Sequence, residues 1–203
     1  MEENLDHEQS LSLINEMISR ARNNVTTKGA YSLIYWGYIT SLLAIINSVL
    51  MNTLSNPSQS FLIWSLILPA TVGSVFIERR NNRKNLVKTH IDKIGAMVWL
   101  GFLISFFVFT FVLHTISIKF EITQIFIANT PVIMIMVGMG HFITACVFRQ
   151  KKWFAIAAFT WCCAILCAFL NVDMQFLVFA ACMIGGLVIP GHILYSKAKK
   201  SHV

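Results

Sequence analysis

Long uncharged apolar runs alternate with short polar segments along most of this 203-residue chain. Six runs contain no Asp, Glu, Lys or Arg, and their lengths are near the roughly 20 residues that cross a hydrocarbon core about 30 Å thick. Because unpaired backbone groups are costly in lipid, each run is predicted to be a helix, whereas barrel strands would alternate in polarity. The six predicted spans are residues 31–52, 61–77, 94–117, 124–148, 153–170 and 176–195.

The N-terminal segment, residues 1–30, has a different pattern. Its first eight residues carry four acidic side chains, and from Ser10 onward apolar residues such as Leu11, Ile14 and Ile18 recur at helical spacing. Ser10 is a plausible N-cap, and the arginines that follow the stripe suit the C-terminal end of a helix dipole. We therefore expect a short amphipathic helix on the membrane surface or against the cytosolic ends of the spans.

The connections on one side of the predicted spans are too short to hold a domain. They comprise residues 53–60, 118–123 and 171–175, so consecutive spans should form three antiparallel hairpins. The predicted fold class is an all-α membrane protein. Residues 31–195 form a six-transmembrane-helix bundle, which the short cytosolic amphipathic helix precedes and a basic cytosolic tail, residues 196–203, follows.

The basic residues predict the orientation of this bundle. Of the 16 Lys and Arg residues, all except Lys119 lie in segments on the same side of the six predicted spans. An excess of Lys and Arg marks the cytoplasmic side, so both termini are expected in the cytosol and the protein in the cytoplasmic (inner) membrane. The four segments are residues 20–28, 79–93, 149–152 and 197–200.

The same distribution explains the formal charge of +7 without nucleic acid. A nucleic-acid interface gathers basic residues on one soluble face, whereas these residues lie at the ends of spans. Their expected partners are the lipid bilayer and its anionic headgroups.

Two histidines within the predicted spans are the main candidates for chemistry. His141 precedes Arg149 by eight residues and His192 precedes Lys197 by five, so their depths differ by only about 4 to 5 Å at 1.5 Å per residue. Facing imidazoles could relay protons, bind a metal or haem, or hold a small ligand; alternatively, each bonds a nearby carbonyl or headgroup water. The predicted inner polar site consists of His141, His192, Gly138, Gly140, Pro190 and Gly191.

A second polar group is expected toward the outer side of the spans. Asn47, His114, Asn129 and Thr130 fall at similar predicted depths. Hydrogen bonds between helices in a membrane average about 0.6 kcal/mol and are mostly structural. We therefore expect this outer polar cluster to hold helices together.

Motifs of common catalytic sites are missing from the sequence. It has no paired carboxylates within the spans, no Gly-rich phosphate loop and no His-x-x-x-His pattern. No catalytic, cofactor-binding or metal-ligating residues are assigned, and the chain is not expected to be an enzyme.

Three short motifs resemble those of a family of small bacterial membrane proteins without an assigned activity. They are Ile18-Ser19-Arg20-Ala21-Arg22-Asn23-Asn24, Tyr35-Trp36-Gly37, and Ile189-Pro190-Gly191-His192-Ile193-Leu194. The resemblance covers nearly the whole chain and implies a six-span bundle in a bacterial cytoplasmic membrane. It supplies no catalytic residues.

We therefore expect an accessory, sensing or scaffolding membrane component without catalytic activity. The N-terminal helix and the basic loop of residues 78–93 should contact a cytosolic or membrane protein, or a second copy of the chain. The alternative is a small-solute or proton-linked transporter that uses His141, His192 and the prolines of spans two, four and six. Those prolines are Pro69, Pro131 and Pro190.

Overall fold

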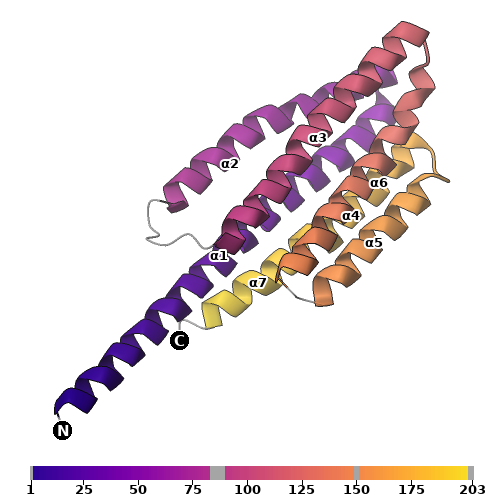
Figure 1. Cartoon of the computed structure of the whole chain (residues 1–203). Helices are drawn as coiled ribbons and strands as arrows, with labels where there is room; N and C mark the ends of the chain where they lie inside the picture. The colour runs from indigo at the N-terminus through magenta and orange to yellow at the C-terminus, as the bar shows by residue number, and fades with distance from the viewer. Residues whose placement is uncertain (1, 83–89, 149–150, 201–203) are drawn as a thin grey trace.

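The computed structural model describes residues 2–82, 90–148 and 151–200. Within these ranges the secondary structure is helical, which confirms the all-α class (Figure 1). Two short segments are 3₁₀ helices and one is a π-helix. In chain order the elements are α1 (Glu2–Thr53), η1 (Pro57–Leu66), α2 (Ile67–Asn82), α3 (His90–Phe120), η2 (Thr123–Ala128), α4 (Asn129–Phe148), α5 (Lys151–Cys167), α6 (Val172–Met183), η3 (Ile184–Val188) and α7 (Ile189–Lys200).

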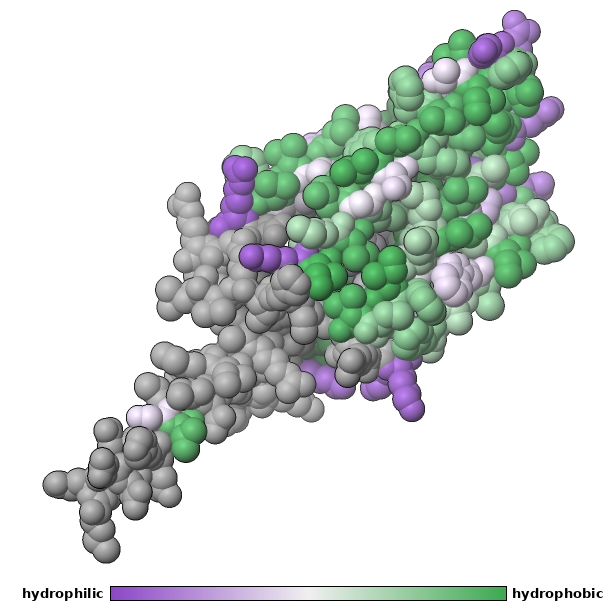
Figure 2. Space-filling view, in the orientation of Figure 1, coloured by the Kyte–Doolittle hydropathy of each residue, from purple (hydrophilic) through white to green (hydrophobic). Residues whose placement is uncertain are grey.

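In the described part of the chain, five helical segments are long and apolar enough to cross a membrane, so the chain is a multi-pass membrane protein by length and composition. Figure 2 agrees, because apolar side chains cover most of the visible bundle surface and hydrophilic ones gather toward its ends. The sixth expected span, residues 153–170, is not among these segments. It corresponds to α5, which has 17 residues and a length of about 26 Å. The five segments are Gly29–Thr53, Pro57–Ile77, Lys93–Phe120, Gln124–Val147 and Val172–Lys197.

Helix α1 is longer than the sequence pattern predicts. The expected N-terminal helix is not separate: α1 runs without interruption from Glu2 through the first span to Thr53, and Ser10 lies inside it rather than at its N-cap. The physical reason is that residues 2–53 contain no proline and only two isolated glycines, so nothing stops the helix before the span. Figure 1 shows the N-terminal part of α1 extending beyond the other helices.

Helix α1 packs antiparallel to α6 and α7 and contacts both over much of their length. The Ser41 hydroxyl donates to the Ala180 carbonyl at 3.2 Å, and the Ser48 hydroxyl donates to the Asp173 carbonyl at 2.9 Å. Small hydroxyl side chains of this kind let two membrane helices approach closely and also bond across the contact.

The helices divide into an inner group and a peripheral group. Half of the residues in the apolar stretch of the α6–α7 span are buried inside the protein. Only 6% of the corresponding stretch in the α3 span and 11% in the η1–α2 span are buried. The main core therefore lies among α1, α4, α5 and α6, while α2 and α3 present most of their apolar side chains outward. In this core, Ala44, Met134, Ala164, Phe179 and Met183 belong to one buried cluster.

Candidate functional site

His141 lies in the core of the bundle. Its side chain is fully buried on α4, with the Trp99 ring of α3 at 5.7 Å between centroids and the Trp153 ring of α5 at 5.8 Å. Its Nδ1 is 3.4 Å from the Thr160 hydroxyl of α5. Its Nε2 is buried and has no hydrogen-bond partner among the residues that the structure describes.

The π-helix η3 packs against this histidine. A Cβ atom added at Gly186 would lie 3.3 Å from His141 Cε1, so the backbone of η3 reaches the imidazole ring directly. Pro190 explains the wider turn, because it has no N–H and its ring would clash with the carbonyl four residues earlier in a regular helix. The Ile189 N–H instead donates to the Ile184 carbonyl, five residues back. Single π-turns of this kind are frequent at functional sites.

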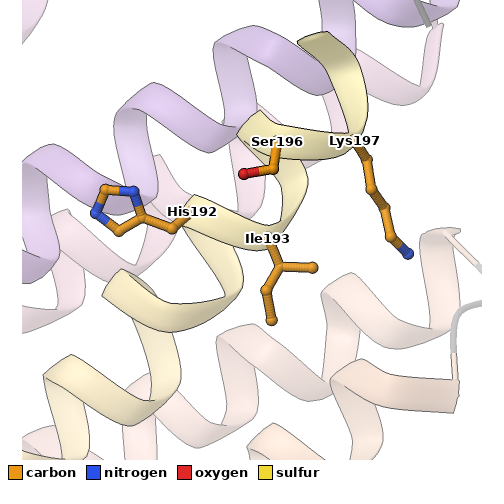
Figure 3. A pocket seen from close by; sticks show the side chains of 4 residues that line it. All are labelled: His192, Ile193, Ser196 and Lys197. Atoms are coloured by element: carbon orange, nitrogen blue, oxygen red, sulfur yellow. The ribbon is translucent and has the colours of Figure 1, made fainter. Parts of the chain in front are cut away.

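His192 lies in a different environment. Its side chain is exposed, and its Nε2 is 3.1 Å from the Tyr38 hydroxyl of α1. A surface pocket of about 300 Å³ adjoins it, lined by His192, Ile193, Ser196 and Lys197. Figure 3 shows His192 directed toward α1 and Lys197 extending away from it, so these side chains do not converge on one point. The structure therefore gives His141 and His192 separate neighbours rather than a shared site.

The glycines of the predicted inner site contribute to packing. Gly138 lies directly beneath the indole of Trp161, which donates from Nε1 to the Ile135 carbonyl at 3.2 Å. A Cβ at Gly140 would lie 3.6 Å from the Trp99 ring. At Gly191 it would lie 2.8 Å from Ile34 Cγ1 of α1. Because glycine has no side chain, these three positions leave room for the neighbouring side chains.

The predicted outer cluster is not joined by hydrogen bonds in the described part of the chain. Asn47 is fully buried and both of its amide atoms lack a partner there, as does Asn129 Oδ1. Thr130 is buried, whereas His114 is exposed and its ring lies 6.3 Å from that of Phe126. Two of the four residues, Asn47 and Thr130, are thus buried, Asn129 is half-buried, and the expected bonded network is not seen among the described residues.

Two polar residues that matter for the core were not singled out from the sequence. Thr160 contacts His141, and Gln175 donates from Nε2 to the carbonyls of Cys167 and Leu170 at 3.0 and 3.1 Å. These carbonyls lie at the end of α5 and in the turn after it, where regular helical donors run out, and the Cys167 carbonyl also accepts from the Leu170 N–H at 3.1 Å. Their positions in the sequence could have indicated them, because Thr160 lies inside an apolar run and Gln175 lies directly before one.

Within the described ranges, no group of three or more His, Cys, Asp or Glu side chains gathers closely enough to hold a metal ion. No protein-family model matches the chain, and no similar protein was found among curated proteins or solved structures. The fold and the sites thus define the class, a helical multi-pass membrane protein with a fully buried histidine, His141, in its core.

Proposed function

We propose that the protein is a non-enzymatic accessory, sensing or scaffolding component of a bacterial cytoplasmic membrane, and that it presents its N-terminal helix to a protein partner. The observation that carries this proposal is the continuity of α1. The first candidate span begins at Gly29, yet the helix begins at Glu2. Residues 2–28 therefore add about 40 Å of helix beyond the span at 1.5 Å per residue.

The proposal includes a sixth span and a defined orientation. We infer that α5 crosses the membrane together with the three residues that follow it, because residues 153–170 carry no charged side chain. Six crossings place the basic segments together on the cytosolic side, as the charge bias of membrane proteins favours. Residues 2–28 then lie in the cytosol, with anionic headgroups beside the basic segments that flank the spans.

The projecting part of α1 suits contact with a protein rather than burial in lipid. Its described side chains at Gln9, Ser10, Leu11 and Ser12 are exposed, and Leu11 is 61% exposed. Acidic residues dominate the first eight positions, so anionic lipid headgroups would repel that end. The basic loop of residues 78–93 is proposed as a second contact; residues 83–89 of this loop fall outside the described residues.

Photocrosslinking in living cells tests the partner proposal. A photoreactive amino acid replaces Leu11 in one variant and Phe111, an outward-facing residue of α3 that is 72% exposed, in a control. The Leu11 probe is expected to form a protein adduct, while the Phe111 probe should recover lipid. An adduct of twice the protein's mass would identify a second copy as the partner. Recovery of lipid alone from the Leu11 probe would contradict the proposal.

The competing proposal is a small-solute or proton-linked transporter. The observation that favours it is the π-helical break at Ile184–Val188 beside Pro190, because transporters often bind substrates where membrane helices are interrupted. Flux of protons or small solutes in proteoliposomes distinguishes the two. Flux that is lost when His141 is replaced by Phe would favour transport over the accessory role.

A further inference from the structure

A surface pocket lies where the last candidate span meets the membrane boundary. The span ends at Lys197, and the pocket of about 300 Å³ is lined by His192, Ile193, Ser196 and Lys197. Ligand pockets commonly measure about 300–1,000 Å³, so this one has room for a phosphate group and the atoms attached to it. Lipid headgroups lie just outside the hydrocarbon core, at the level where spans end. The pocket therefore lies at the depth of the headgroup phosphates.

The side chains that line the pocket are spread along α7. His192 is directed toward α1, where its Nε2 lies 3.1 Å from the Tyr38 hydroxyl, whereas Ile193 and Lys197 extend from another side of α7 (Figure 3). This spread suits an elongated ligand better than a compact ion, because the ligand meets an apolar side chain and then a charged one. The pocket is thus suited to a molecule with an apolar part and a charged part.

An exposed apolar ridge leads from the pocket into the membrane. Ile189, Ile193 and Lys197 follow one another at intervals of four residues, so they share one face of α7. Ile189 is 53% exposed and Ile193 is 49% exposed, since α7 packs along α1 and η3 with its other faces. At 1.5 Å per residue, the two isoleucines lie about 12 and 6 Å deeper than Lys197. An acyl chain can lie along this ridge while its headgroup reaches Lys197.

The charge at this end of α7 suits an anion. Lys197 is exposed, and Lys199 and Lys200 follow it in the sequence. Residues 174–203 contain no Asp or Glu, and Asp173 lies at the other end of the span, about 36 Å from Lys197 along the helices at 1.5 Å per residue. The Ser196 hydroxyl adds a neutral donor next to the Lys197 ammonium. Both groups can donate to phosphate oxygens, and hydrogen bonds to an ionised group are the stronger ones.

We propose that this pocket binds one anionic phospholipid. Its phosphate accepts from the Ser196 hydroxyl and the Lys197 ammonium, and one acyl chain lies along Ile193 and Ile189. The proposal rests on the headgroup contacts proposed above for the basic segments, and it gives one of them a defined position. It does not depend on a protein partner of residues 2–28, so a failed crosslink at Leu11 leaves it unaffected.

Native mass spectrometry of the full chain in a neutral detergent tests the proposal. The protein is titrated with phosphatidylglycerol, which is anionic, or with phosphatidylcholine of the same chain length, whose choline cation Lys197 would repel. Wild-type protein is expected to bind a first phosphatidylglycerol molecule more tightly than phosphatidylcholine. Lys197→Gln should weaken that first binding by about tenfold, because a hydrogen bond between charged groups is lost. Ser196→Ala should weaken it less, because the Lys197 charge remains.

Lys93→Gln is the matched control for Lys197→Gln. Lys93 is exposed at the start of another candidate span, so its replacement removes the same charge without touching the pocket. Circular dichroism checks that each variant keeps the helical content of the wild type, as expected for exposed positions. Equal effects of the two substitutions, or equal binding of the two lipids by the wild type, would overturn the proposal.

A competition experiment separates a lipid site from a site for a free phosphate ester. Glycerol 1-phosphate has the headgroup chemistry without acyl chains, and at a concentration equal to that of the lipid it is expected not to displace it. Ile193→Asn interrupts the apolar ridge and should weaken lipid binding although Lys197 remains. Displacement by glycerol 1-phosphate, or unchanged binding in Ile193→Asn, would show that the acyl chain is not recognised and would overturn the proposal.

Discussion

The close contact of α1 with η3 predicts a specific effect of Gly37→Ala. A Cβ atom at Gly37 would lie 2.7 Å from Val188 Cγ2, 3.0 Å from Leu187 Cβ and 3.1 Å from the Val188 backbone nitrogen. The last two atoms belong to or adjoin the backbone, so a side-chain rotation cannot remove the clash. Overpacking typically costs about 1–3 kcal/mol, and the rigid contact favours the upper part of that range.

The gain in helix propensity offsets part of this cost. Alanine is better than glycine inside a helix by at most about 1 kcal/mol, so the expected net loss is about 2 kcal/mol. For a chain of about 200 residues this loss lowers Tm by about 4–8 °C. The assay is thermal unfolding of the purified protein in one fixed detergent, followed by circular dichroism and by the monodisperse fraction that remains after heating.

Gly101→Ala is the matched control for this prediction. Gly101 lies on α3, and a Cβ there would meet nothing within 4 Å. The same chemical change should therefore leave Tm unchanged or raise it slightly. A Gly37→Ala protein that melts at or above the wild-type temperature, or equal effects of the two substitutions, would refute the packing that the structure shows between α1 and η3.

Three further substitutions test single interactions under the same conditions. Ser48→Ala removes the bond to the Asp173 carbonyl and should cost about 0.5–1.5 kcal/mol, as judged by Tm; no loss would argue against the register of α1 with α6. Trp161→Phe removes the bond to the Ile135 carbonyl, and the expected loss is of similar size; an unchanged Tm would show that the indole N–H is not bonded. Asn47→Leu replaces a buried amide without partners by an apolar side chain of similar size, so Tm should stay the same or rise, and a clear fall would reveal a missing partner of Asn47.

The sequence predicted the helical class and most spans because apolar runs of membrane length have few alternatives in lipid. It did not predict the true start of α1. The change from polar to apolar composition at residue 31 looks like a boundary, yet a helix needs a strong breaker to end, and residues 2–53 contain no proline and only two isolated glycines. Helix α5 shows the opposite error, because the apolar run continues past Cys167 into turns.

The sequence predicted similar depths for the two candidate histidines, but it could not predict the direction of their side chains around the helix axes. Counting residues from the basic segments gave His141 and His192 similar levels in the membrane, but it could not show which way each side chain points around its helix axis. The structure directs His141 into the core beside Thr160 and His192 outward beside Tyr38. Pro190 indicated a disturbed helix, whereas the π-turn and its contact with His141 depend on packing between helices.

The proposed six crossings would put the projecting helix and the C-terminal end together on the cytosolic side. Cysteine labelling, after the five native cysteines are replaced by alanine, measures the side of each end. Single cysteines then replace Ser10, Ser58 or Ser196, which are all exposed. A membrane-impermeant maleimide should label position 58 in intact cells with permeable outer layers, and positions 10 and 196 only after the cytoplasmic membrane is opened. Labelling of positions 10 and 196 from opposite sides would contradict six crossings.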